Sequence, residues 1–185
     1  MSVDLDHIQT VYAQADCLFF EAQVEAAIDR IASEITEVLI GTNPLIYTVM
    51  NGGLVFAGKL LTRLNFPLEL SYLHATRYRN TTTSGALDWK VPPAQDMKGR
   101  TVLIVDDILD EGHTLAAIVD FCNTQDVERI LTAVLVNKRH DRKAHNTMKS
   151  DFTGLDSEDR YLFGYGMDYQ GYWRNAPGIF ALKEQ

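Results

Sequence analysis

Apolar side chains recur along this chain in two spacings, one typical of helices and one typical of buried strands. Residues 21–39 predict a helix, because apolar side chains recur every three or four residues, at Val24, Ile28, Ile31, Ile35 and Val38. Gly41 and Pro44 predict the end of this helix, since glycine favours the position after a helix and proline cannot continue one.

Short aliphatic runs alternate with helical patterns over the following part of the chain. The expected strands are 45–50, 68–75, 101–105 and 130–136, and the expected helices are 54–65 and 113–123. Strands that alternate with helices form parallel βαβ units. We therefore expect an α/β fold in which a parallel, Rossmann-like sheet is covered by helices on both faces.

Two segments depart from this alternation. A polar stretch without periodicity, over about 77–90, is predicted to be a mobile lid loop, of the kind that excludes water from reactive intermediates. The tail over about 151–185 is rich in aromatic residues and short strand-like pieces. We interpret the tail as a small subdomain packed over the sheet, within a single domain that spans 1–185.

Charge and composition narrow the class of protein. The 185 residues include 17 basic and 25 acidic side chains, giving a formal net charge of −8. This sign argues against a protein that coats nucleic acid, because such binding depends on neutralising phosphates. The start of the chain lacks the features of a signal peptide, and no apolar run approaches the roughly 20 residues of a membrane span. We expect a cytoplasmic protein without membrane partners, in which isolated Cys17 and Cys122 are buried thiols.

The stretch "TVLIVDDILDEGHTL", residues 101–115, carries the candidate chemistry. Its aliphatic run ends in Asp106 and Asp107, and ligands of parallel sheets bind beyond the carboxyl ends of the strands. The following "DEGHT" precedes a predicted helix, where backbone N–H groups and the helix dipole favour a phosphate. Carboxylates that could bind ribose hydroxyls or a metal ion lie next to a backbone turn that could bind a phosphate. This combination indicates that the ligand is a phosphoribosyl compound.

Two other classes of acidic site fit the stretch less well. Receiver domains also hold magnesium with an acidic pair after a strand, but their pair belongs to the first strand, and this one follows 100 residues. An EF-hand needs acids at alternate loop positions, which Ile108 and Leu109 interrupt.

The segment "VLIVDDILDEGHTL" resembles the phosphoribosyl pyrophosphate (PRPP) motif of type I phosphoribosyltransferases. From about residue 15 to 180 the chain resembles hypoxanthine-guanine phosphoribosyltransferases, with the segments "VMNGGLVF", "VNKRH" and "RYLFGYGMDYQGYWR" in that family's order. The resemblance implies a purine salvage enzyme. Its reaction would transfer the phosphoribosyl group of PRPP to hypoxanthine or guanine, giving IMP or GMP and pyrophosphate, with Mg²⁺ as cofactor.

The same resemblance implies roles around the PRPP motif. Asp110 matches the catalytic acid, which accepts a proton from the base, and Asp106 and Asp107 match the pair that binds ribose directly or through magnesium-bound water. The 5′-phosphate loop would comprise Asp110, Glu111, Gly112, His113 and Thr114.

The pyrophosphate site is implied at Asn51, Gly52, Gly53 and Arg174. Asn51 departs from the family, where a lysine is frequent, so charge neutralisation would rely more on magnesium and Arg174. In relatives this loop holds a non-proline cis peptide, which would here join Met50 to Asn51.

The purine site is implied at Lys138, Tyr161, Leu162 and Asp168. Lys138 would donate to the 6-oxo group, Tyr161 would stack on the base, and Leu162 would offer main-chain contacts. Asp168 would ligate magnesium, with Asp106 and Asp107 as further candidate ligands. Arg77 and Tyr78 stand in the lid where relatives have Ser-Tyr. Relatives are dimers or tetramers, so a homodimer or homotetramer is expected.

Two rival functions remain to be weighed against salvage. A regulator could keep the fold and bind PRPP or a nucleotide as a signal, but such regulators carry a DNA-binding domain or a basic face. A phosphoribosyltransferase for pyrimidines or orotate conflicts with the purine-type tail. Both are less consistent with this sequence than a salvage enzyme.

Overall fold

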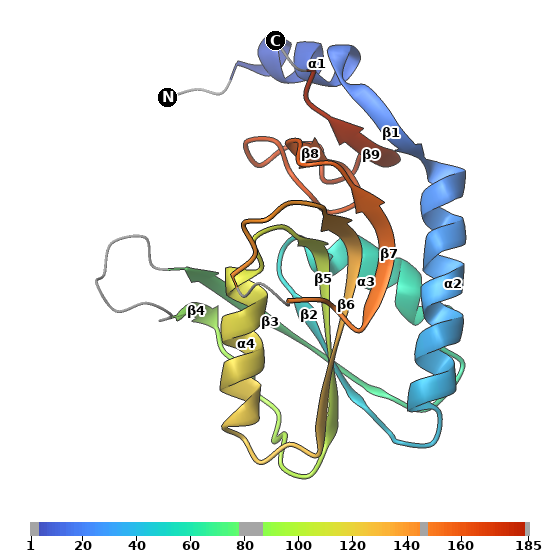
Figure 1. Ribbon diagram of the computed structural model, residues 1–185, viewed down its shortest axis with the longest axis vertical. Coiled ribbons are helices and arrows are strands. Elements are labelled where there is room, and N and C mark those ends of the chain that lie inside the picture. Colours follow the sequence, from blue (N-terminus) through green and yellow to red (C-terminus); the bar gives the residue numbers. More distant parts are fainter. Residues whose placement is uncertain (1–3, 78–86, 145–147, 184–185) are drawn as a thin grey trace.

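The computed structural model describes residues 4–77, 87–144 and 148–183, which form two sheets and four helices within those ranges (Figure 1). The larger sheet has six strands in the order β4-β3-β2-β5-β6-β7. Their bounds are β2 (Leu45–Val49), β3 (Glu69–Arg77), β4 (Leu87–Val91), β5 (Thr101–Leu109), β6 (Arg129–Lys138) and β7 (Phe152–Ser157). Every neighbouring pair is parallel except β3 and β4. The expected α/β fold with a parallel central sheet is confirmed.

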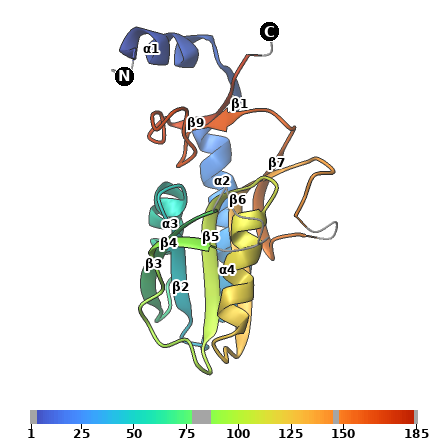
Figure 2. The same cartoon turned by 90° about the vertical axis from the view of Figure 1, so that its left-hand side faces the viewer.

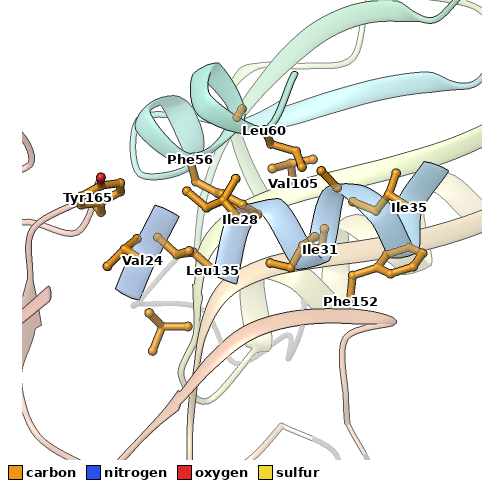
Figure 3. Packing of buried hydrophobic residues seen from close by; sticks show 14 of the residues in the cluster. Val24, Ile28, Ile31, Ile35, Phe56, Leu60, Val105, Leu135, Phe152 and Tyr165 are labelled. Carbon is orange, nitrogen blue, oxygen red and sulfur yellow. The ribbon is translucent and has the colours of Figure 1, made fainter. Parts of the chain in front are cut away.

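Helices cover both faces of this sheet (Figures 1 and 2). α2 (Glu21–Leu39) and α3 (Gly53–Leu61) pack on one face, and α4 (His113–Asn123) packs on the other. Side chains of β5 alternate between the two cores, so that Leu103 and Val105 face α2 and α3 while Ile104 faces α4. Figure 3 shows the first core, where the apolar stripe of α2 meets α3, β5, β6 and β7.

A smaller antiparallel sheet lies above the carboxyl ends of β5 and β6 (Figure 1). It consists of β1 (Asp16–Phe20), β9 (Gly178–Ala181) and β8 (Leu162–Phe163), in that order. The N-terminal helix α1 (Leu5–Gln14) covers it, and Tyr12 stacks on Trp173 with 4.4 Å between ring centroids. We call this sheet and the segment between β8 and β9 the hood. Within the described ranges, no helix combines the length and apolar character that crossing a bilayer requires.

Several predicted boundaries agree with the structure and others need correction. The helices at 21–39 and 113–123 are confirmed. The strand expected at 101–105 continues to Leu109, because β6 pairs with it as far as Asn137, so Asp106 and Asp107 lie within the strand rather than after it. The helix expected at 54–65 spans only Gly53–Leu61.

The predicted lid and tail subdomain also have different limits. β3 extends to Arg77 and β4 begins at Leu87, so both ends of the expected lid at 77–90 are strand; the segment between them lies outside the described residues. Residues 152–157 of the expected tail subdomain form β7, which completes the main sheet beside β6. The hood instead takes in β1 from the N-terminal region, since β1 pairs with β9.

Candidate active site

The carboxyl ends of β2, β3 and β5 surround a cavity of about 710 Å³. Almost all of the residues that the sequence assigns to PRPP line it: Asn51, Gly52, Asp106, Asp107, Asp110, Glu111, Gly112, His113, Thr114 and Arg174. Gly53 lies beneath this cavity as the first residue of α3, where an added Cβ would come within 2.8 Å of the Val105 carbonyl oxygen. One cavity therefore collects residues from three separate sequence segments.

The loop after β5 forms a concave turn at the start of α4. Gly112 caps the helix with a φ of 81°, a left-handed conformation that favours glycine. An added Cβ would also approach the Met148 sulfur to 2.5 Å. The first N–H groups of α4, at His113 and Thr114, line the cavity and suit an anion.

The opposite wall is the loop between β2 and α3. Its Met50–Asn51 peptide is cis, as the resemblance implied. Gly52 lies against Asp107, whose carboxylate oxygen would be 2.2 Å from an added Cβ, and the Gly52 carbonyl would be 2.0 Å from a Cβ on Gly166. Two glycines thus let the β2–α3 loop, the end of β5 and the hood approach one another.

Two positively charged side chains line this cavity, Lys90 from β4 and Arg174 from the hood. Lys90 is the extra residue at a β-bulge opposite His74 and Ala75, a device that re-aims side chains. It lines the cavity with His74 and Arg174, and among described residues it has no hydrogen-bond or ion-pair partner. Burial, followed by the charges of Lys90 and Arg174, lowers the pKa of His74.

A second cavity of about 240 Å³ adjoins the first and contains the residues assigned to the purine. Its lining residues are Asp107, Ile108, Asp110, Lys138, Tyr161, Leu162, Met167 and Asp168. Asp107, Ile108 and Asp110 line both cavities. The carboxylates of Asp107 in β5 and of Asp110 just after it therefore lie where the two cavities meet.

Asp110 is held by two donors. Lys138 Nζ lies 2.7 Å from its Oδ2, and His140 Nε2 lies 2.8 Å from its Oδ1. Partial burial acts to raise the pKa of Asp110, but the hydrogen bonds from Lys138 and His140 outweigh it, and the pKa falls below the usual value. Lys143 Nζ adds bonds to the carbonyl oxygens of Leu109 and Asp110 at 2.7 and 2.6 Å.

The acids of this site form a donor set suited to a hard cation. Burial, together with the neighbouring Asp107 charge, raises the pKa of Asp106 well above its usual value, and burial also raises the pKa of Asp107. Two adjacent carboxylates, one buried and one half-buried, gain from a cation or from hydroxyl donors. Asp168 pairs with Arg174, and its other oxygen accepts the Gly171 N–H at 2.6 Å. Carboxylate oxygens are the ligands that Mg²⁺ takes, so Asp106 and Asp107 fit that ion, whereas Asp168 would bind it only on releasing Arg174.

The hood presents an aromatic ring to the smaller cavity. Tyr161 is half-exposed, its hydroxyl donates to the Asp168 carbonyl at 3.0 Å, and its ring meets Tyr169 edge to face. An exposed ring beside a polar wall is available for stacking on a flat ligand. The Leu162 side chain is buried beneath it.

Besides Gly53, two predicted residues are not brought into either cavity by the described structure. Arg77 contributes backbone to β3, but its side chain lies outside the described part of the chain, as does all of Tyr78. Four residues that sequence reasoning passed over do adjoin the site: His74, Lys90, His140 and Lys143. The nearest signal was "VNKRH", in which Lys138 was recognised but His140 was not.

Comparison with known proteins agrees with this geometry. Residues 19–170 match the model of the phosphoribosyl transferase domain. The chain is 32% identical to the hypoxanthine-guanine phosphoribosyltransferase of Bacillus subtilis, over 90% of this chain and 92% of that protein. It is 31% identical to the hypoxanthine-guanine-xanthine phosphoribosyltransferase of Tritrichomonas foetus, over 90% and 91% of the two chains.

Solved structures extend the likeness to three dimensions. A hypoxanthine-guanine-xanthine phosphoribosyltransferase structure superposes with a TM-score of 0.83 at 29% identity, covering 91% of this chain and 97% of the other. A hypoxanthine phosphoribosyltransferase from Staphylococcus aureus gives 0.87 at 23% identity, covering 99% and 97%, which supports the fold. With its sheet, its PRPP motif and these relatives, the chain belongs to the type I phosphoribosyltransferase family, among the hypoxanthine-guanine phosphoribosyltransferases.

Proposed function

We propose that this protein transfers the 5-phosphoribosyl group of PRPP to hypoxanthine or guanine, releasing IMP or GMP and pyrophosphate. The observation that carries the proposal is the junction of the two cavities at Asp107, Ile108 and Asp110. A sugar phosphate in the larger cavity and a base in the smaller one would meet at that junction. The identities of the Bacillus subtilis and Tritrichomonas foetus relatives support the same reaction.

In the proposed reaction a ring nitrogen of the base attacks the anomeric carbon of PRPP, and the bond to the pyrophosphate oxygen breaks. Positive charge develops on the sugar while the base must lose a proton. Asp110 would accept that proton as general base, since its carboxylate faces both cavities. Asp106 and Asp107 would bind the ribose hydroxyls, and the turn from Asp110 to Thr114 would hold the 5′-phosphate.

Base recognition would combine a donor and an aromatic face. Lys138, which is buried and directed at Asp110, would donate to the 6-oxo group. Tyr161 would stack on the ring, and the main chain of Leu162 would contact its edge. Lys138 would then have to divide its three N–H donors between the base and Asp110, which an ammonium group allows.

The leaving pyrophosphate would lie against Asn51, Gly52, Gly53 and Arg174. Asn51 contributes no charge, so Lys90, whose ammonium has no partner among the described residues, is the supporting cation that we assign to this end of the cavity. Opposite charge at this position would stabilise the pyrophosphate as it separates from the sugar.

Mg²⁺ is the proposed cofactor, held by Asp168 with Asp106 and Asp107 as further ligands. Bound there, the ion would supply charge neutralisation for the pyrophosphate oxygens. Chelator-treated protein should therefore lose turnover and regain it with added Mg²⁺, and undiminished turnover without the metal would refute this cofactor.

Three further expectations belong to the proposal. Arg77 and Tyr78 would close over the site as part of a lid. Exposed Leu54 at the start of α3 and exposed Leu70 and Tyr72 on β3 support a homodimer or homotetramer, which sedimentation would measure. A cytoplasmic location without nucleic acid or membrane partners fits a salvage role.

The test is a turnover assay with PRPP and Mg²⁺ against hypoxanthine, guanine, xanthine and adenine, with nucleotide and pyrophosphate both quantified. We expect equal amounts of pyrophosphate and of IMP or GMP. PRPP binding without turnover on any 6-oxopurine would refute the proposal and favour a regulatory protein.

A further inference from the structure

His140 follows the end of β6 by two residues, and its ring contacts the Asp110 carboxylate. Its side chain is only 4% exposed. The Nε2 atom lies 2.8 Å from Asp110 Oδ1, and the backbone N–H of Arg142 donates to Nδ1 at 3.0 Å. The ring is therefore bonded at both nitrogens, and each bond is to the protein.

These two bonds determine the tautomer of His140. A backbone N–H can only donate, so Nδ1 must be the unprotonated nitrogen that accepts it. The neutral ring then carries its proton on Nε2, which donates to the Asp110 carboxylate. His140 thus gives Asp110 a neutral, directed donor, whereas Lys138 gives it a cationic one.

The two donors differ in what would happen when a purine binds. Lys138 is the proposed partner of the 6-oxo group, so its hydrogen bond to Asp110 Oδ2 must be shared or exchanged. His140 does not line either of the described cavities, so a base would leave its bond to Oδ1 in place. Of these two donors, His140 is therefore the one that can keep the carboxylate oriented throughout the exchange.

The main chain of Asp110 is fixed by the same segment. Lys143 donates to the carbonyl oxygens of Leu109 and Asp110, and the Ala144 N–H donates to the Glu111 carbonyl at 2.6 Å. Residues 140–144 thus hold both the backbone and the side chain at the end of β5.

An alternative interpretation is that Asp110, His140 and Asp159 form a metal site. Single ligand atoms of Asp110, His140 and Asp159 lie within 4.8 Å of one another. However, Asp159 is already bonded to both terminal nitrogens of Arg142, at 2.6 and 3.1 Å, and Asp110 is paired with Lys138. Neighbouring cations compensate these acids, which disfavours a metal ion there.

We propose that His140 is a positioning residue: its Nε2–H holds the Asp110 carboxylate in the orientation that receives the purine proton. This inference rests on the proposed function. His140 does not touch the reacting atoms, so its effect must pass through Asp110.

Two amide substitutions separate the hydrogen bond from the bulk of the ring. The amide nitrogen of glutamine stands as many bonds from Cβ as Nε2 of histidine, so His140→Gln keeps a donor within reach of Asp110. The amide of His140→Asn is one carbon shorter and matches the Nδ1 position. We expect the glutamine variant to stay near the wild-type kcat and the asparagine variant to lose on the order of 10–10²-fold, because small misplacements of a reacting group carry such costs.

The KM for PRPP should stay near the wild-type value in both variants, and so should the melting temperature. Arg139→Gln is the matched control, because this exposed neighbour pairs with Asp156 rather than with Asp110. It should leave kcat unchanged.

A double-mutant cycle then tests whether the effect passes through Asp110. In an Asp110→Asn background, His140→Asn should cost little further activity, since the carboxylate it orients is gone. The inference would be overturned if the effects of the two substitutions on kcat were fully additive, or if the glutamine and asparagine variants had equal rates. In either case an active wild-type protein would leave the proposed function standing. A wild-type protein without turnover would refute both.

Discussion

Lys138 is the residue on which purine choice should depend, because an ammonium group has three donors and no acceptor. The 6-oxo group of hypoxanthine or guanine would accept from it, whereas adenine carries an amino donor at that position. A buried mismatch of about 3–4 kcal/mol corresponds to discrimination on the order of 10²–10³. We expect kcat/KM for adenine to be lower than for hypoxanthine by that factor, with Lys138→Ala narrowing the gap by impairing the 6-oxopurines.

The control for this variant is Arg139→Ala, which removes an adjacent exposed cation. Stacking on Tyr161 cannot restore discrimination, since every purine offers the same face. Comparable kcat/KM for adenine and hypoxanthine in the wild-type protein would remove Lys138 from this role.

Lys90 should matter at the other end of the site. Because its ammonium lines the larger cavity without a partner among the described residues, Lys90→Gln should raise the KM for PRPP on the order of tenfold. The effect should shrink as salt is added, since an exposed charge is screened. Lys98→Gln, an exposed lysine away from both cavities, should have no effect. Equal KM values in the two variants would mean that Lys90 does not face the pyrophosphate.

The residues that the sequence could predict are those inside contiguous motifs. Asp110 and Lys138 were assigned from short strings whose order matches the family, and both line the same cavity. Lys90 could not be found this way, because a β-bulge decides which way its side chain points. His140 was missed because its partner Asp110 is 30 positions away in sequence.

At the scale of elements, the approach of β5 to the β2–α3 loop depends on Gly52. Its backbone is in the ordinary helical region, so alanine is conformationally allowed, but the new Cβ would meet the Asp107 carboxylate. Gly52→Ala should therefore displace Asp107 and lower kcat/KM by about tenfold or more, as misplaced catalytic groups do.

Gly58→Ala is the matched control, since this glycine lies within α3 with open space around its Cβ position. There alanine should stabilise the helix by about 0.5–1 kcal/mol. Thermal unfolding and steady-state kinetics should be measured for both variants. Unchanged kinetics in Gly52→Ala would show that displacing Asp107 does not affect catalysis.

Element boundaries were predictable where local signals were strong. Gly112 and the polar residues before it mark the start of α4, and the predicted helix has the observed bounds, His113–Asn123. The end of β5 was misplaced because Asp106 and Asp107 read as a loop, whereas pairing with β6 keeps them extended. Tertiary pairing outweighed local preference at that point.

At the scale of the whole molecule, Glu25 ties the hood to the helical layer. It accepts from Tyr165 at 2.5 Å and pairs with Lys59 and Arg63. Burial acts to raise the pKa of Glu25, but the bonds from Lys59, Tyr165 and Arg63 outweigh it and lower the pKa to about 2. This contact between the hood and the helices therefore depends on one carboxylate that is ionised at neutral pH.

The pH dependence of the free energy of unfolding follows from the lowered pKa of Glu25. A group whose pKa is lowered on folding contributes stability above its unfolded pKa, near 4.5, and loses that contribution as pH falls toward 2. Glu25→Gln should lower the free energy of unfolding at pH 7 by about 1–3 kcal/mol and reduce its decline below pH 4.5. Glu34 forms an exposed pair with Arg30, so Glu34→Gln should change the free energy of unfolding by less than about 0.5 kcal/mol. Parallel acid-unfolding curves for wild type and Glu25→Gln would contradict this account.

The overall arrangement was predictable only in part. The alternation of strands and helices indicated the parallel sheet, but the hood joins β1 near the N-terminus to β8 and β9 near the C-terminus. Pairing between segments so distant in sequence leaves no periodic signal. β7 was assigned to the tail for a different reason: it is a short strand at the start of the aromatic-rich segment, although it pairs with the nearby β6.

The central claim is that Asp110 serves as general base where the two cavities meet. The most direct test measures turnover of Asp110→Asn with hypoxanthine alongside its affinity for PRPP. We expect kcat to fall by roughly 10²–10⁴, the usual contribution of a general base, with the fold and PRPP affinity retained. A variant that binds PRPP normally and turns over at the wild-type rate would contradict the claim.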